Sequence, residues 1–337
     1  MQAQLFTFWI GIDVAKATVE AAIHPSRESA TFERTRSGMR RLSDWARARC
    51  GAHAAVRAVM EATGNYSSEA IAWLLEADAA LAPACVNPLH AKRFAQSIGT
   101  RNKTDRVDAC VLARMGAERS PAPYEAPGPV VLELRALVRE RRELVDEATR
   151  LKNRIGEGTG SRFVSRERNR ILKATQAAIA RIEEEMERVI ASDARLAADS
   201  RRLCTIPGVG PVTAATILGE LGDLRRFGSG RQLAAFAGLS PRRFESGATV
   251  RGRARLCKQG NPAIRAILYM SAVSTSRMAS GMKATYDRLL AHGKAPKCAL
   301  GALMRKQLIL MRALVVGGKD YEEPVENNDR EDAKNLA

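Results

Sequence analysis

The stretch LFTFWIGID, residues 5–13, decides the fold of the first half of this 337-residue chain. Its apolar run is far too short to cross a bilayer and ends in an acid, so we interpret Phe6–Asp13 as a buried strand. Residues Thr18–His24 follow almost at once and are expected to form its hairpin partner. The stretch therefore predicts a sheet whose first strand carries an acid at its end.

Helical and strand patterns then alternate as far as residue 120. We expect two further strands and three helices, at Ala55–Met60, Pro83–Val86, Thr35–Cys50, Tyr66–Ala77 and Thr104–Met115. Such alternation is typical of an α/β domain with a central sheet. Residues 5–120 are therefore predicted to be one α/β domain.

Proline marks the end of this domain, because residues 121–129 contain four of them. Residues 130–195 carry apolar side chains at helical spacing, interrupted by a glycine-rich break at 156–160. They predict a helical hairpin or coiled-coil arm, or equally a helix pair packed on its own domain. Residues 198–320 are expected to form a mainly helical domain, and the polar residues 321–337 a disordered tail.

The charge of the chain points to nucleic acid. Lys and Arg number 54 against 37 Asp and Glu, a net charge of +17. A field of this sign attracts polyanions and releases their counterions. An ordinary basic protein remains an alternative. A membrane surface fits less well, since no strongly basic helix has an aromatic face, and no membrane span or secretory signal is recognisable.

The six cysteines and four histidines do not suggest a metal site. No pair of cysteines has the close spacing of a zinc or redox motif, and the histidines are scattered singly. We interpret the cysteines as reduced thiols of a cytoplasmic protein.

Four acids stand out by their positions. Asp13 ends the first strand, Glu61 follows the strand Ala55–Met60, and Asp105 and Asp108 lie three apart in an expected helix, on one face. Such acids can converge on one or two Mg²⁺ ions, which prefer oxygen ligands and can promote phosphodiester cleavage. Each acid alone has a plain structural explanation, because acids are common at strand ends and helix starts.

The motifs around these acids resemble those of a known family. Residues 11–13 (GID), 61–64 (EATG) and 102–105 (NKTD), with Asp108, are similar to the DEDD signature of bacterial insertion-sequence transposases of the IS110 family. The resemblance implies a RuvC-like domain of RNase H fold, with a five-stranded mixed sheet flanked by helices. It also implies that the four acids bind the metal. Lys16 and residues 87–103, with Phe94, Gln96, Arg101, Asn102 and Lys103, match the family as well.

In the second half, residues 203–215 (LCTIPGVGPVTAA) predict a helix–hairpin–helix. Gly208 and Gly210 allow a tight turn, and the N–H groups that begin the next helix could hold a phosphate. A helix–turn–helix that serves packing alone is the equal alternative.

A basic loop follows. Residues 241–260 contain six basic residues and one acid. We expect Lys16, Arg101 and Lys103 of the first domain and this loop to contact nucleic acid, through Arg242, Arg243, Arg251, Arg253, Arg255 and Lys258. A solvated loop without a ligand is the alternative.

Three hydroxyl groups near this loop are candidate nucleophiles. A serine can attack phosphorus and form a covalent intermediate. The residues alone do not choose among Ser240, Ser246 and Thr249. The resemblance selects Ser246, within the sequence Glu-Ser-Gly, and we place Arg251, Arg253 and Lys258 nearest the developing charge.

The resemblance also implies an activity and partners. The carboxylates of one subunit would work beside the serine of another, to cleave and rejoin donor and target DNA. A structured guide RNA would pair with both DNAs, and the assembly would be a tetramer built from dimers, in the bacterial cytoplasm on the nucleoid. The rival hypotheses are a junction-resolving nuclease without serine chemistry and a nucleic-acid-binding protein without activity.

Overall fold

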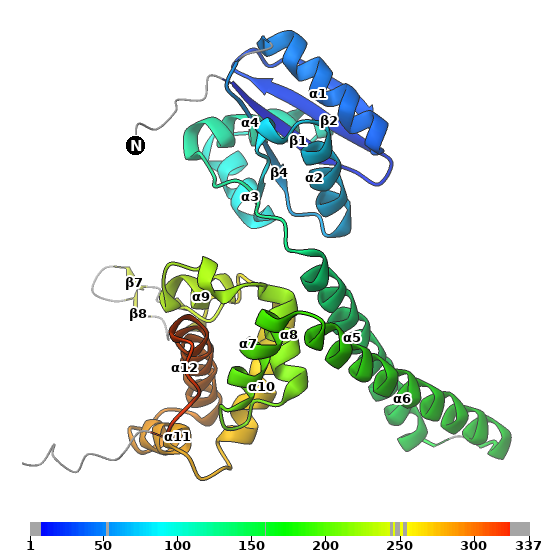
Figure 1. Cartoon of the computed structure of the whole chain (residues 1–337), viewed down its shortest axis with the longest axis vertical. Helices are drawn as coiled ribbons and strands as arrows, with labels where there is room; N and C mark the ends of the chain where they lie inside the picture. The colour runs from blue at the N-terminus through cyan, green and yellow to red at the C-terminus, as the bar shows by residue number, and fades with distance from the viewer. Residues whose placement is uncertain are drawn as a thin grey trace, which may run out of the picture. The chain divides into compact units, whose positions relative to one another are not determined.

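The computed structural model describes residues 8–51, 54–158, 160–242, 245–246, 250–251 and 255–323, with only backbone described between 243 and 255. The chain divides into two compact units, Met1–Ala126 and Pro127–Ala337 (Figure 1). Each unit is described by itself below.

The first unit is built on a five-stranded sheet. Its strands are β1 (Phe8–Val14), β2 (Thr18–His24), β3 (Ser29–Glu33), β4 (Val56–Glu61) and β5 (Ala84–Val86). Their order in the sheet is β3-β2-β1-β4-β5. Strands β1, β2 and β3 are antiparallel neighbours, whereas β4 runs parallel to both β1 and β5. The predicted mixed sheet of five strands is confirmed.

Helices cover both faces of this sheet. They are α1 (Arg36–Cys50), α2 (Asn65–Ala77), α3 (Pro88–Ser97) and α4 (Asp105–Arg119), with a 3₁₀ turn η1 (Ala79–Leu81). Alternate residues of β1 join different cores, as the period of a strand requires. Ile10 and Ile12 pack with side chains of α1 and α2. Trp9 packs with side chains of α3 and α4 on the other face.

Glycines set how closely α4 approaches β1. A Cβ on Gly11 would lie 2.0 Å from the carbonyl oxygen of Ala109 and 2.2 Å from the backbone nitrogen of Ala113. One turn further along α4, a Cβ on Gly116 would lie 2.4 Å from the ring of Trp9. Helix α4 therefore runs antiparallel to β1, and its first turn lies beyond the carboxyl end of that strand.

Strand β3, helix α3 and the 3₁₀ turn η1 were not predicted. Strand β3 is the edge of the sheet and reads Ser-Ala-Thr-Phe-Glu, without the apolar run of a buried strand. Helix α3 has only ten residues; it begins at Pro88, and Asn87 caps it by accepting from the Leu89 N–H. The other predicted elements agree with the observed ones to within a few residues.

The second unit is mainly helical, as predicted. Its helices are α5 (Pro129–Gly156), α6 (Arg162–Ala191), α7 (Ala194–Cys204), α8 (Pro211–Leu221), η2 (Leu224–Arg226), α9 (Gly230–Phe236), α10 (Pro262–Thr275), α11 (Gly281–Ala291) and α12 (Pro296–Gly317). Two short strand pairs join β6 (Pro241–Arg242) to β9 (Arg255–Leu256) and β7 (Glu245–Ser246) to β8 (Val250–Arg251). One apolar core runs from Leu134 in α5 to Val315 in α12.

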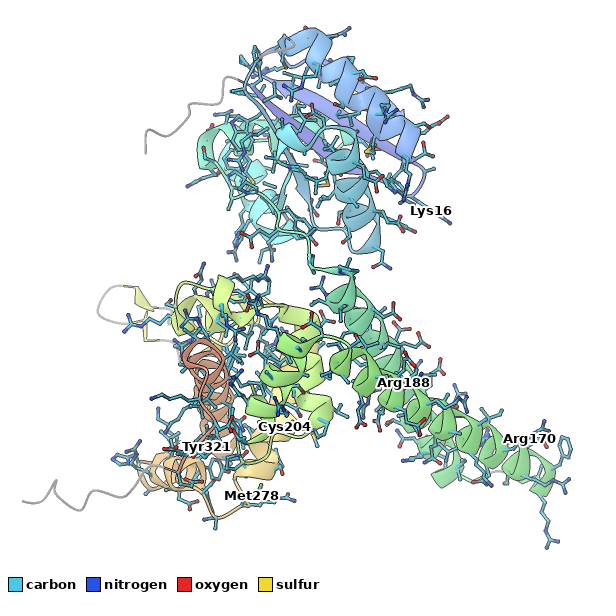
Figure 2. All side chains as sticks on the ribbon, in the orientation of Figure 1. Lys16, Arg170, Arg188, Cys204, Met278 and Tyr321 are labelled. Atoms are coloured by element: carbon cyan, nitrogen blue, oxygen red, sulfur yellow. The ribbon has the colours of Figure 1, made fainter. Side chains whose placement is uncertain are left out.

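The two longest helices, α5 and α6, pack along each other. In Figure 2, Arg170 lies toward the far end of this pair and Arg188 lies nearer its base. Coiled-coil geometry for the pair stays a prediction.

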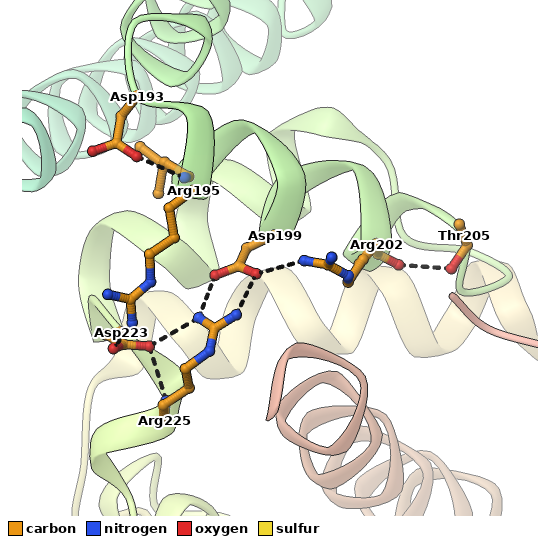
Figure 3. A network of polar contacts seen from close by, with 8 residues as sticks. Asp193, Arg195, Asp199, Arg202, Thr205, Asp223 and Arg225 are labelled. Carbon is orange, nitrogen blue, oxygen red and sulfur yellow. Dashed lines mark hydrogen bonds and ion pairs between the residues drawn. The ribbon is translucent and has the colours of Figure 1, made fainter. Parts of the chain in front are cut away.

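An ion-pair network around the buried Asp199 holds α7 to the turn after α8 (Figure 3). Asp199 is 5% exposed and accepts from both terminal nitrogens of Arg225, at 2.6 and 2.8 Å. It also accepts from Arg202 at 3.1 Å, while Asp223 pairs with Arg225 and Arg195. The buried carboxylate is therefore fully paired, as a buried charge must be. In the described parts of the chain, no helix has the length and apolar character of a membrane span.

Candidate active site

The first two predicted acids lie at the ends of adjacent parallel strands. Strand β1 pairs with β4 as far as Ile12 beside Met60, so the next positions, Asp13 and Glu61, are neighbours across the ladder. Alternation places Asp13 on the same face as Trp9, which is the face that α4 covers. Both acids are half-buried.

The other two acids lie in the first turn of α4. The Thr104 hydroxyl caps this turn by accepting from the Val107 N–H at 3.2 Å. Asp105 is exposed and Asp108 is half-buried. Because α4 packs closely against Gly11, its first turn faces the strand ends that carry Asp13 and Glu61.

The charges of the four acids are coupled. The pKa of Asp13 is raised to about 6, first by burial and then by the charges of Asp105, Asp108 and Glu61. Burial and Asp108 raise the pKa of Glu61, and burial and Asp105 raise the pKa of Asp108. The structure thus brings the four acids into one electrostatic cluster, which we call the carboxylate cluster.

Two predicted nucleic-acid contacts lie beside this cluster. Lys103 lowers the pKa of Glu61 and of Asp108, so its ammonium group is near both. Lys16 is exposed on the turn between β1 and β2, two residues beyond the end of β1 (Figure 2). Arg101 is exposed between α3 and α4.

The donors of the carboxylate cluster suit a hard divalent cation, which prefers several carboxylate oxygens. Asp13, Glu61 and Asp108 have raised pKa values, so the ionised cluster gains from a nearby positive charge. Within the described ranges, however, no three His, Cys, Asp or Glu side chains are gathered closely enough to hold a metal ion. The cluster therefore has the oxygen donors that such a cation prefers, and they lie on the α4 face of the sheet. The carboxylates would have to move closer together to bind it.

Arg34 was not predicted as part of this region. Its Nε donates to the carbonyl oxygen of Lys16 at 2.8 Å, and its guanidinium group pairs with Glu69 and lies 4.5 Å from the ring centroid of Tyr66. Arg34 thereby joins the turn after Asp13 to α2, the helix that follows Glu61. Nothing in its sequence surroundings distinguishes it from an ordinary surface arginine.

In the second unit, Ser246 lies in β7 and pairs with Val250 of β8, while Glu245 pairs with Arg251. Only the backbone of this hairpin is described. Arg243, Arg253 and Thr249 lie outside the described residues. Arg242 is exposed in β6 and pairs across the ladder with Arg255 of β9.

The base of the basic loop is held tightly. A Cβ on Gly260 would lie 2.3 Å from the carbonyl oxygen of Phe236, so only glycine fits there. Arg265 donates to the Gly260 carbonyl oxygen at 2.8 Å. Lys258 takes a left-handed φ of 54°, and its N–H donates to the carbonyl oxygen of Gly238 at 3.1 Å. We call this arrangement the neck of the loop.

The two glycines of the predicted helix–hairpin–helix differ. Gly208 has a φ of 78°, and a Cβ there would lie 2.2 Å from Oγ1 of Thr275. Its carbonyl oxygen accepts from the Ser271 hydroxyl, so glycine is needed here for packing against α10. Gly210 precedes α8, and a Cβ there would meet nothing within 4 Å. A phosphate contact at either glycine stays a prediction.

Comparisons with known proteins agree with this arrangement of domains. Residues 10–157 match a family model of DEDD-type IS110 transposases, described as "Transposase". Residues 200–287 match a second model, described as "Transposase IS116/IS110/IS902 family". The two matches lie on either side of α6 and include the carboxylate cluster and the basic loop.

Two relatives are similar to this chain over most of their length. The "Pilin gene-inverting protein" of Moraxella bovis is 29% identical over 325 residues, covering 94% of this chain and 98% of its own. The "Transposase for insertion sequence element IS1111A" of Coxiella burnetii is 27% identical over 271 residues, 70% of this chain and 72% of its own. The protein is therefore a transposase or recombinase that acts on DNA. It belongs to the IS116/IS110/IS902 family of transposases.

Proposed function

We propose that this transposase cleaves and rejoins DNA with the carboxylate cluster and Ser246 acting on one phosphodiester. The observation that carries the proposal is the electrostatic coupling of Asp13 with the other three acids on the α4 face of the sheet. Coupled acids with shifted pKa values are typical of functional sites. The family membership supports DNA as the substrate.

The proposed step is a transesterification. The Ser246 oxygen bonds to phosphorus, its proton passes to a base or water, and the leaving oxygen of the cut strand takes up a proton. In the second step, a strand hydroxyl attacks the phosphoserine and releases Ser246. One phosphodiester is exchanged for another, so no external energy source is needed.

The acids and the basic loop have separate proposed tasks. The carboxylate cluster would hold one or two divalent cations, for which we propose Mg²⁺, and these would neutralise charge at the scissile phosphate. Arg251, Arg253 and Lys258 would stabilise the charge that develops on phosphorus. Arg242, Arg243, Arg255, Arg101, Lys103 and Lys16 would bind the flanking backbone, with Gly208 and Gly210 holding a phosphate.

We further propose a structured RNA as guide and a homotetramer, a dimer of dimers, as the active assembly. Both follow from the resemblance of the motifs to the family. Base pairing would select donor and target DNA, while the protein holds backbone and shape. The carboxylates of one subunit would meet the serine of another.

A specific observation favours inversion as a second outcome of the same chemistry. The Moraxella bovis relative, aligned over 94% of this chain, is named for gene inversion. Cleavage and rejoining between two sites on one DNA inverts the intervening segment when the sites are in opposite orientation. We therefore expect the same active site to support insertion and inversion.

The test is a covalent-adduct assay. The full chain, the RNA encoded beside its element and donor DNA are incubated with Mg²⁺, and denaturing electrophoresis detects protein attached to DNA. The wild type should form the adduct and Ser246→Ala should form none. Ser240→Ala and Thr249→Ala are the matched controls and should form it normally.

Each other result has a definite meaning. Cleavage that persists in Ser246→Ala without any adduct would favour the junction-resolving nuclease. An adduct in Ser246→Ala would move the nucleophile to Ser240 or Thr249. Binding without Mg²⁺-dependent cleavage would favour a nucleic-acid-binding protein without enzymatic activity.

A further inference from the structure

A basic groove lies in the first unit beside α4, and none of the four acids of the carboxylate cluster lines it. Its volume is about 690 Å³. Its walls come from the β2–β3 hairpin, the α3–α4 connection and α4 itself. Arg106, Cys110 and Arg114 are four residues apart on α4 and form one wall, and Arg27 of the hairpin also lines the groove.

The arginines give the groove its charge. Arg27, Arg106 and Arg114 are exposed. Arg114 pairs with Glu118 at 2.7 Å, whereas among the described residues no ion pair joins Arg27 or Arg106 to a carboxylate. The guanidinium groups of Arg27 and Arg106 both lower the pKa of Cys110, which burial raises, so both lie near the same thiol. The charge of Glu20 also acts on this thiol and Glu118 lines the groove, so the three arginines outnumber the nearby carboxylates and leave an excess of positive charge.

The backbone at Arg27 is unusual for an arginine. Its φ is 63°, in the left-handed region that favours glycine or asparagine. The hairpin turn is closed by the Arg27 N–H, which donates to the carbonyl oxygen of Ile23 at 2.7 Å. A turn that glycine would form more easily carries instead a cationic side chain at the mouth of the groove.

Apolar side chains form a second part of the lining. Ile23, Ile98, Val107 and Val111 line the groove together with the arginines, and the other lining residues include His24, Thr100 and Glu118. Cations that alternate with apolar side chains suit a single strand, whose phosphates meet the arginines while sugars and bases lie on the apolar wall. A duplex offers mainly phosphates to a surface and would leave the apolar wall uncovered.

The groove is next to the carboxylate cluster. Arg106 lies between Asp105 and Asp108 in the first turn of α4, on the side that faces the hairpin. From Arg106 to Arg114 the helix rises about 12 Å. Each strand of a duplex rises about 3.4 Å per nucleotide and an extended single strand rises more, so this length spans at least two phosphates.

We propose that this groove binds the phosphodiester backbone of a nucleic-acid single strand that continues from the carboxylate cluster along α4. The proposal rests on the proposed function for its ligand class. DNA and RNA share the backbone chemistry, and the experiment distinguishes them. Binding here would hold the strand beside the reacting phosphate without reading its sequence.

The test measures binding without cleavage. The full chain is titrated, in EDTA, with a labelled single-stranded DNA, a single-stranded RNA and a duplex DNA of one sequence, at several salt concentrations. For Arg27→Gln with Arg106→Gln, the salt slope on a single strand should fall by about 1.4, because each lost phosphate contact contributes about 0.7. Arg40→Gln with Arg119→Gln removes the same charge from α1 and from the end of α4, and should leave the slope unchanged.

A further variant separates weaker binding from loss of folding. Arg27→Gly removes one guanidinium group and relieves the left-handed backbone, so its melting temperature should not fall while its slope drops by about 0.7. A smaller salt slope on DNA alone or on RNA alone would identify which nucleic acid the groove binds. Equal decreases on both would mean that the groove does not distinguish the two sugars. Equal slopes for groove and control variants, or an effect confined to the duplex, would overturn the proposal. Since no cleavage is measured, this outcome is independent of the adduct assay.

Discussion

The two sets of candidate catalytic residues are positioned in opposite ways. The carboxylate cluster stands on buried elements, since Asp13 and Glu61 lie at the ends of β1 and β4, next to buried residues of these strands. Ser246 stands in a two-residue strand of a loop that is fixed at its neck by Gly260 and Arg265. Metal ligands need fixed geometry, whereas a nucleophile that works on a neighbouring subunit's DNA needs reach. Under the proposed function, the carboxylate cluster would be the half of the site that the sheet holds in place, and Ser246 would be the half carried on a loop.

Substitution of the carboxylates should reduce DNA cleavage most strongly. Asp105→Asn and Glu61→Gln should each lower the rate of DNA cleavage about 1000-fold or more, because metal binding supplies several kcal/mol to such reactions. Single-turnover cleavage with Mg²⁺ measures the rate. Both variants should keep the wild-type circular dichroism and melting behaviour. Normal cleavage by either variant would contradict the assignment of the metal site.

A substitution in the packing between α4 and β1 should also disturb the carboxylate cluster. Gly11→Ala adds a methyl group where α4 already touches β1, so α4 must shift. We expect a loss of about 1–3 kcal/mol in the free energy of unfolding and a large loss of cleavage. Denaturant unfolding measures the first. Gly156→Ala, at the end of α5 where a Cβ meets nothing within 4 Å, is the control and should change neither quantity.

The charge coupling in the cluster predicts a pH dependence. The pKa of Asp13 is about 6 in the folded chain, above its usual value, so the folded state holds the proton more tightly than the unfolded state does. Without Mg²⁺, the free energy of unfolding should therefore fall as pH rises from about 4 to 6. Asp13→Asn has no carboxyl group to ionise, so its free energy of unfolding should not fall in this way. At pH 7.5 the variant should be more stable than the wild type by on the order of 1 kcal/mol, after allowance for solvent screening.

At pH 4 the variant and the wild type should differ little, because the wild-type carboxyl is then protonated in the folded state and about half protonated in the unfolded state. Added Mg²⁺ should stabilise the wild type more than Asp13→Asn. Thermal unfolding at four pH values measures both effects. A variant that is less stable than the wild type at pH 7.5 in EDTA would contradict the coupling.

The smallest expected effect concerns the turn after β1. Arg34→Lys keeps the charge but loses the Nε contact to the Lys16 carbonyl oxygen and the planar stacking on Tyr66. We expect a loss of about 1 kcal/mol in stability and a several-fold slower cleavage. Arg41→Lys, whose exposed pair with Glu33 contributes little, is the control. Equal effects of the two variants would remove Arg34 from the site.

The same contrast explains what could be predicted from the sequence. Buried strands and amphipathic helices have strong periodic patterns, so β1, β4 and α1 were predicted closely. Asp13 stood out because it ends such an element, and Glu61 because it follows one. Edge strand β3 and the short α3 lack that signal, since an exposed edge need not be apolar and ten residues carry few turns.

Other parts depend on contacts that no local pattern encodes. Gly11 matters because α4 is seated on it, and Arg34 because three separate segments meet around its guanidinium group. The groove beside α4 joins arginines from positions 27, 106 and 114. Ser246 could be chosen over Ser240 and Thr249 only through the family resemblance, because a hydroxyl in a polar loop has no distinguishing sequence pattern.

Mixed assemblies of two inactive variants test the central claim, that the carboxylates of one subunit and the serine of another act on one phosphodiester. Tagged Asp105→Asn protein is combined with untagged Ser246→Ala protein, together with RNA, DNA and Mg²⁺. The account predicts that neither variant forms a covalent DNA adduct alone and that the mixture forms one on the tagged chain, which keeps Ser246. A mixture that forms no adduct, although the two chains are shown to assemble, would contradict it.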